Sequence, residues 1–295
     1  MSGGVKVWIE ASRPKTLAAA IVPIVIGSAE AYRVGSFEWF PVLICLAFAL
    51  LVQIGTNMAN DYYDFLKGAD TEERVGPERM VSSGLIVPKQ MLVVTIAIFA
   101  LAFLVGLNLV AYRGWEMLVV GVISILFGFA YTGGPYPLAY HGLGDVFVVL
   151  FFGLVATGGT FYVLTGQLVA EPLLIGGSVG LLANNILVIN NYRDQETDEQ
   201  ANKRTLIVRW GRSFGILQYG AQLLGAATLL VIYVGRTQNF LALIPLVLLP
   251  IGLSIWSRLP RSEGSDLNAL LGQSARFLLL YGLALGAVLV ASVSI

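Results

Sequence analysis

The chain has 295 residues, of which 57% are hydrophobic and only 12% are charged, and its mean hydropathy is +0.78. Soluble domains carry about 25% charged residues, so this composition excludes a soluble globular domain, a disordered chain and a nucleic-acid binder with a basic face. The 18 basic and 18 acidic residues cancel, so the net charge indicates no class of partner. A single cysteine, Cys45, excludes a disulfide framework and a multi-cysteine metal site. We therefore expect an all-α integral membrane protein.

Nine apolar runs each have about the 20 residues that a helix needs to cross a bilayer. The runs are continuous rather than alternating, which excludes an outer-membrane barrel. Residues 1–15 lack the features of a cleavable signal, and we expect one membrane domain over residues 1–295. Two glycine pairs, Gly176 with Gly180 and Gly282 with Gly286, have the spacing of close helix contacts in lipid. The expected spans are residues 16–34, 39–59, 91–112, 115–133, 144–166, 172–191, 214–234, 239–256 and 275–294.

The basic residues predict the orientation of these spans. With the N-terminus in the cytoplasm, fifteen of the 18 lysines and arginines lie on the inner side, and only Arg33, Arg113 and Arg236 lie outside. Cytoplasmic loops carry such an excess, so we expect this orientation in a prokaryotic cytoplasmic membrane. The inner loops 60–90, 134–143 and 192–213 then hold nearly all of the polar chemistry.

Two of the expected spans end in acidic motifs on the same side of the membrane. The second span ends in N-M-A-N-D-Y-Y-D (57–64), and the sixth ends in N-N-Y-R-D-Q-E-T-D (190–198). Residues spaced three or four apart share one helical face. Since an even number of spans separates the two motifs, we expect their carboxylates to converge in one pocket at the cytoplasmic surface. The expected set is Asn57, Asp61, Asp64, Asn190, Asp194 and Asp198.

Clustered carboxylates near lipid are costly unless a cation compensates them. All-oxygen clusters suit hard cations, and Mg²⁺ is usually held by one or two carboxylates while it bridges to substrate phosphates. Lys67, Arg79, Lys203 and Arg204 add donors suited to phosphate oxygens. The pattern favours a diphosphate site with magnesium, or manganese in its place. The alternative is that both motifs are ordinary solvated helix ends.

Weaker signals lie in the loop before the fifth span. Asp145 is either a helix N-cap or a substrate contact. His141, the one histidine, fits a surface or capping role. Five tyrosines crowd the same surface, where they either form an interfacial belt or shield a cationic intermediate: Tyr62, Tyr63, Tyr131, Tyr136 and Tyr140.

Taken together, these residues resemble the UbiA-type intramembrane prenyltransferases, and most of all the 1,4-dihydroxy-2-naphthoate polyprenyltransferase branch. The resemblance covers nearly the whole chain. It rests on five ordered motifs: R-P-K-T-L (13–17), N-D-Y-Y-D-F-L-K-G-A-D (60–70), G-P-E-R-M-V-S-S-G (76–84), Y-T-G-G-P-Y-P-L-A-Y-H-G-L-G-D (131–145) and N-N-Y-R-D-Q-E-T-D-E-Q-A-N-K-R-T-L (190–206).

The resemblance implies nine helices around a central cavity and Mg²⁺ between two aspartate motifs and a polyprenyl diphosphate. It implies transfer of the polyprenyl group to an aromatic acid, with loss of CO₂ and diphosphate, to give demethylmenaquinone. Asp61, Asp64, Asp194 and Asp198 are the expected catalytic residues and, with Asn57, the metal ligands. Lys67, Arg79, Lys203, Arg204 and Lys15 are the expected diphosphate-binding residues. The residues expected to face the acceptor or the cation are Tyr62, Tyr131, Tyr140, Asp145 and Asn190.

Two departures from the family pattern bear on these expectations. Gly68 stands where many relatives outside this branch have a third aspartate, which leaves the role of Asp70 open. Asn202 stands where glycine commonly precedes the lysine, and asparagine is the next-best residue for a left-handed turn. Two alternatives remain: the same chemistry on another aromatic acceptor such as 4-hydroxybenzoate, and a membrane cation transporter. A transporter is disfavoured because the spans carry almost no charge between the two surfaces.

Overall fold

The computed structural model describes residues 2–70 and 75–294, and within these ranges every regular element is a helix. Arg74, one of the basic residues assigned to the inner side, lies outside the described residues. The elements are α1 (Ser2–Ala11), η1 (Pro14–Thr16), α2 (Ala18–Arg33), α3 (Trp39–Leu66), α4 (Pro88–Arg113), α5 (Trp115–Ala130), η2 (Leu138–His141), α6 (Gly144–Val148), η3 (Val149–Val155), α7 (Ala156–Thr165), α8 (Ala170–Arg193), α9 (Gln195–Gln200), α10 (Leu206–Thr237), η4 (Phe240–Leu248), α11 (Leu249–Arg258), η5 (Leu259–Arg261), α12 (Ser265–Ala291) and η6 (Ser292–Ser294).

The long helices are apolar enough to cross a membrane. Among the described residues, seven helical segments meet this requirement by length and composition. One of the seven, Gly144–Thr165, is a continuous rod built from α6, the π-helical segment η3 and α7. The N-terminal segment and α2 form a further apolar pair bent by 55°, and α5 is a shorter apolar helix. The chain is therefore a multi-pass, all-helical membrane protein, as its composition predicts.

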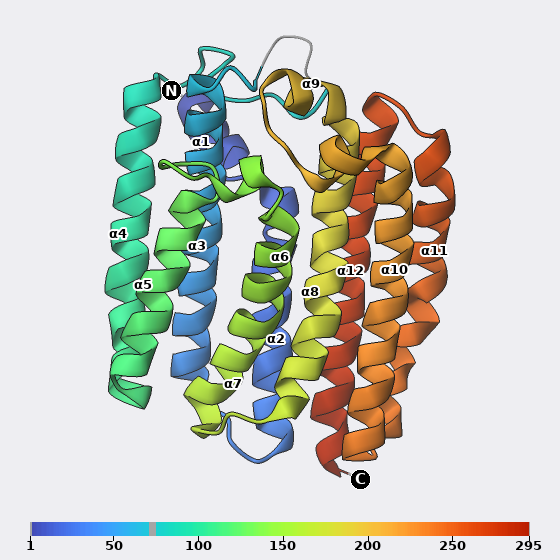
Figure 1. Cartoon of the computed structure of the whole chain (residues 1–295). Helices are drawn as coiled ribbons and strands as arrows, with labels where there is room; N and C mark the ends of the chain where they lie inside the picture. Colours follow the sequence, from blue (N-terminus) through green and yellow to red (C-terminus); the bar gives the residue numbers. More distant parts are fainter. Residues whose placement is uncertain (1, 71–74, 295) are drawn as a thin grey trace.

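Helix α8 occupies the centre of the bundle, and α3, α4 and α5 lie to one side of it (Figure 1). In the most apolar window of α8, 78% of the residues are buried, against 22% in α3 and in α4. Helix α8 packs against α2, α10, α12 and η3. Apolar side chains on the outer helices face outward because lipid, rather than protein, surrounds them.

Small residues allow α8 to approach η3 closely, as their spacing predicts. A Cβ atom on Gly153 of η3 would lie 2.7 Å from the carbonyl oxygen of Gly176. A Cβ atom on Gly180 would lie 2.8 Å from the carbonyl oxygen of Val149. Any larger side chain would force the two backbones apart. Gly282 of α12 faces Val22 of α2 in the same manner.

The polar connections gather at one end of the bundle. In Figure 1 the N-terminus, α9 and the loops after α3 and α5 all lie at the top of the view. The connections at the opposite end are short. The C-terminal ends of α3 and α8, which carry the two acidic motifs, therefore lie at the same end of the molecule.

Candidate active site

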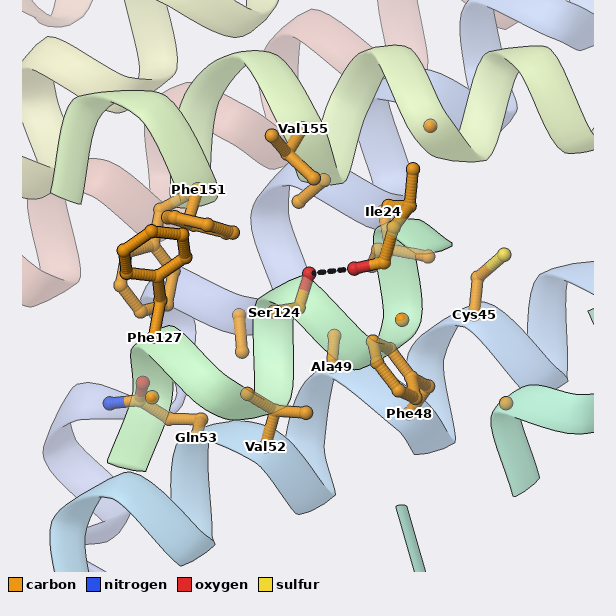
Figure 2. A pocket seen from close by; sticks show the side chains of 18 of the residues that line it. Ile24, Cys45, Phe48, Ala49, Val52, Gln53, Ser124, Phe127, Phe151 and Val155 are labelled. Atoms are coloured by element: carbon orange, nitrogen blue, oxygen red, sulfur yellow. Dashed lines mark hydrogen bonds between the residues drawn. The ribbon is translucent and has the colours of Figure 1, made fainter. Parts of the chain in front are cut away.

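An apolar cavity runs between α3, α5 and the α6–α7 rod. Figure 2 shows Phe48 and Val52 on one wall and Phe151 and Val155 on another. Along α3 its wall extends from Cys45 to Thr56, which is about 16 Å at 1.5 Å per residue. An apolar, elongated cavity of this kind suits a hydrocarbon chain.

A second, polar cavity lies toward the end of the bundle where the long loops gather. Its wall includes Asp64, Arg79, Asp145 and Lys203, together with several asparagines. The two cavities share part of their walls, so they adjoin each other. The shared residues are Gln53, Thr56, Tyr131, Val148 and Phe152.

In the first acidic motif, Asp61 and Asn57 hold neighbouring segments in place. The two carboxylate oxygens of Asp61 accept the backbone N–H groups of Met80 and Val81, at 3.0 and 3.1 Å. Asn57 donates to the backbone carbonyl of Ser12 at 2.9 Å. Asn57 lines the polar cavity, whereas Asp61 is not part of its wall. The role of Asp61 as a metal ligand stays a prediction.

Asp64 stands at the centre of a polar network. Its Oδ1 accepts the hydroxyl of Tyr140 at 2.9 Å, and its Oδ2 lies 3.3 Å from Nη2 of Arg79. Arg79 also pairs with Asp70 at 3.2 Å. Burial, followed by the charge of Asp64, raises the pKa of Tyr140, so the phenol keeps its proton and donates it. Asp70 therefore contributes to this network through Arg79.

In the second motif each aspartate has its own basic partner. Arg193 makes two hydrogen bonds to Asp194, both 2.7 Å long, and a third to Asn190 at 2.8 Å. Asp198 pairs with Lys203 at 3.2 Å through Oδ1. Its Oδ2 is buried and has no hydrogen-bond partner within the part of the chain that the structure describes.

Burial and charge perturb the ionisable groups around this network. Burial raises the pKa of Asp198 to about 6, although the charge of Lys203 opposes the rise. For Lys203 burial lowers the pKa, but the nearby carboxylates, Asp198 first, outweigh it and hold the pKa above its ordinary value. Burial lowers the pKa of Lys67, which lies 4.1 Å from the ring centre of Tyr140. Lys203 lines the polar cavity, and perturbed ionisable groups beside a cavity are typical of functional sites.

The predicted site residues divide into those that line the polar cavity and those that do not, and Asp61, Asp194 and Asp198 are among the latter. Asn57, Asp64, Arg79, Lys203, Tyr131, Asp145 and Asn190 line the polar cavity. Tyr140 and Lys67 stand beside Asp64, with Tyr140 bonded to its carboxylate, and the role of Tyr140 toward the acceptor stays a prediction. Lys15 and Arg204 are exposed, and Tyr62 packs against the cluster around Met58 and Met80.

Two arginines of the site, Arg13 and Arg193, were predicted only to lie on the cytoplasmic side of the membrane. Arg13 lines the polar cavity, although Lys15 in the same motif was the expected contact. Arg193 is buried against Asp194. A signal was available for Arg193, because an arginine beside an aspartate at a buried helix end needs a partner. Asn202 adopts a φ of 58°, which confirms the left-handed turn predicted before Lys203.

The carboxylates do not yet form a complete metal site. Among residues 2–70 and 75–294, no three Asp, Glu, His or Cys side chains lie close enough together to hold a metal by themselves. Instead, Arg79, Arg193 and Lys203 each pair with a different aspartate. Magnesium needs only one or two carboxylates when substrate phosphates supply further oxygens. The oxygen-rich donor set and the unpartnered Oδ2 of Asp198 fit such an ion.

Comparisons with known proteins show what this chain is similar to. The model of the UbiA prenyltransferase family matches residues 20–281. A 1,4-dihydroxy-2-naphthoate octaprenyltransferase from Haemophilus influenzae is 39% identical over 237 residues, covering 76% of this chain and 75% of the relative. An enzyme of the same name from Escherichia coli is 36% identical over 235 residues, covering 77% and 75%. The fold matches that of a UbiA homologue from Archaeoglobus fulgidus solved with GPP and Mg²⁺, with a TM-score of 0.66, 17% identity, and coverage of 95% and 99%.

Proposed function

The chain belongs to the UbiA prenyltransferase family, and we propose that it transfers a polyprenyl group from its diphosphate to 1,4-dihydroxy-2-naphthoate. The reaction releases diphosphate and CO₂ and gives demethylmenaquinone. The observation that carries this proposal is that the polar and apolar cavities adjoin through a shared wall. A polyprenyl diphosphate has a charged head and a hydrocarbon tail, so it fills both cavities at once. The names of the bacterial relatives support the naphthoate acceptor.

The charged head of the substrate would lie in the polar cavity. Arg79 and Lys203 line that cavity and donate to phosphate oxygens, and Lys67 lies beside them. Asp64 and Asp198 would hold Mg²⁺, and the other predicted ligands, Asn57, Asp61 and Asp194, complete the proposed set. When bound, the ion stabilises the negative charge that develops on the departing diphosphate. Binding would require the carboxylates to exchange their present basic partners for the metal and its diphosphate.

The shared wall of the two cavities would hold the reacting carbon of the substrate. Departure of diphosphate leaves an allylic cation there, next to the rings of Tyr131 and Phe152. Aromatic faces stabilise a desolvated cation. The apolar residues around them keep water away from the cation, so that the electron-rich ring of the acceptor, and not water, attacks it.

We also propose nine membrane crossings with the polar cavity open to the cytoplasm. The seven long spans, the bent N-terminal pair and α5 supply these nine segments. Glu199 is exposed at the end with the polar loops, and Leu168 is exposed at the opposite end. In a Cys45→Ala background, a membrane-impermeant thiol reagent should label Glu199→Cys from the cytoplasm only and Leu168→Cys from outside only. The reverse pattern would contradict this orientation.

The function is tested by the purified protein in detergent with geranyl diphosphate and Mg²⁺. We expect diphosphate release coupled to prenylation of 1,4-dihydroxy-2-naphthoate, and little with 4-hydroxybenzoate. Faster turnover of 4-hydroxybenzoate would move the assignment to another acceptor. If no diphosphate is released with any of the aromatic acids, the proposal is contradicted.

A further inference from the structure

Asp145, the first acidic residue of α6, is held by two amide side chains from other helices. Its Oδ1 accepts Nδ2 of Asn184 in α8 at 3.0 Å and Nε2 of Gln218 in α10 at 2.6 Å. Asp145 is 6% exposed and lines the polar cavity. Among the described residues, no other side chain donates to Asp145, and no lysine or arginine pairs with it.

This arrangement is costly as a purely structural device. A buried carboxylate that lacks a cationic partner loses its hydration without a full replacement. Two amide donors on one oxygen compensate part of that cost and fix the orientation of the carboxylate. Apolar residues at positions 145, 184 and 218 together would pack with less penalty. A buried acceptor that faces a cavity instead indicates a ligand that donates a hydrogen bond.

Asp145 lies close to the shared wall of the two cavities. Its neighbour Gly144 touches Tyr131, because a Cβ atom on Gly144 would lie 2.8 Å from the tyrosine hydroxyl. Val148, one turn further along the rod, belongs to both cavities. Asp145 therefore stands near the predicted site of the allylic cation and outside the network of Asp64, Arg79 and Lys203.

We propose that Asp145 binds a ring hydroxyl of the aromatic acceptor, and that Asn184 and Gln218 are positioning residues for it. This inference rests on the proposed function. The second oxygen of the carboxylate, Oδ2, accepts the hydroxyl proton in a hydrogen bond, which increases the electron density of the ring. The negative charge of Asp145 also repels the carboxylate of the acceptor. The 4-hydroxyl, which is the hydroxyl farther from the carboxylate at position 2 of the ring, consequently faces α6, and the carboxylate faces away.

Steady-state kinetics of three variants test the proposal. Asp145→Asn should raise the KM for 1,4-dihydroxy-2-naphthoate by about tenfold or more, since hydrogen bonds to charged groups are among the strong ones. Gln218→Met keeps the carboxylate but removes one donor, and should raise the same KM by about threefold. The KM for geranyl diphosphate should stay unchanged in both. Gln222→Met, one turn further along α10 and without contact to Asp145, is the matched control and should alter neither constant.

A second measurement uses naphthoates as competitive inhibitors and requires no turnover of the analogue. We compare 1,4-dihydroxy-2-naphthoate analogues that lack one hydroxyl, in wild type and in Asp145→Asn. Loss of the hydroxyl that Asp145 binds should weaken inhibition of wild type and leave inhibition of the variant nearly unaffected. Equal losses in both proteins would overturn the proposal. So would a Gln218→Met enzyme whose KM for geranyl diphosphate rises as much as that for the acceptor.

These outcomes are distinct from a failure of the proposed function. If wild type does not prenylate 1,4-dihydroxy-2-naphthoate, the acceptor assignment fails and the inference about Asp145 fails with it. If wild type is active and Asp145→Asn and Gln218→Met leave both KM values unchanged, only the inference fails. Retained binding of radiolabelled geranyl diphosphate shows that each variant is folded.

Discussion

The two cavities lie end to end along the same helices, yet they differ in chemistry. On α3, one stripe of residues spaced three or four apart begins with Cys45, Ala49 and Val52 in the apolar cavity and ends with Asn60 and Asp64 in the polar one. The α6–α7 rod shows the same gradient in the opposite chain direction. Polarity therefore changes along the helix axis rather than around it. This arrangement suits a substrate with a charged head and a long apolar tail.

Removal of divalent metal should have the largest effect on turnover, because it removes the function of the polar cavity alone. We expect EDTA to abolish turnover and added Mg²⁺ to restore it, because the polar cavity needs positive charge beyond its lysines and arginines to hold a diphosphate among aspartates. Diphosphate release from geranyl diphosphate is the measurement, with Mn²⁺ as a second ion. Full turnover in a chelated, divalent-free assay would remove the metal from the proposed site.

Asp198→Asn should produce the next largest effect, a loss of about a hundredfold or more in kcat. Its buried Oδ2 has no partner within the described residues, and the amide removes the charge that a metal requires. Glu199→Gln is the matched control on the following, exposed residue and should leave kcat unchanged. If the kcat of Asp198→Asn stays within threefold of that of wild type, the metal is bound elsewhere.

The acidic motifs and the apolar spans could be predicted from the sequence because both follow from helical periodicity and bilayer thickness. The partners that cross between helices could not. Tyr140 bonds to Asp64, and no spacing rule connects residues from such distant segments. Helical periodicity also could not predict the backbone contacts of Asp61 or the exposure of Lys15. Helical phase puts Asp61 near Asp64, but only the fold brings the backbone of Met80 to its carboxylate.

The length of the apolar cavity provides a smaller, selective test. Cys45 lies at the end of the cavity farthest along α3 from Asp64, so a larger side chain there shortens the space for the tail. Cys45→Phe should leave geranyl diphosphate unaffected and raise the KM for longer prenyl diphosphates by about tenfold, since overpacking costs about 1–3 kcal/mol. Leu43→Phe, on the exposed side of the same helix, is the control. Equal loss with geranyl and longer substrates would show that the tail lies elsewhere.

Tyr131, where the two cavities meet, should give the smallest effect. Tyr131→Leu removes the aromatic face but keeps a side chain of apolar character, and we expect kcat to fall by about three- to tenfold, as a cation–π contribution of about 1 kcal/mol predicts. Tyr131→Phe should stay near wild type, because the ring and not the hydroxyl stabilises the cation. Tyr136→Leu, in the same loop but exposed, should change nothing. The ratio of kcat values for Leu and Phe at position 131 measures the ring alone. If Tyr131→Phe loses as much as Tyr131→Leu, the hydroxyl is the active group, and the shared wall binds the acceptor rather than the cation.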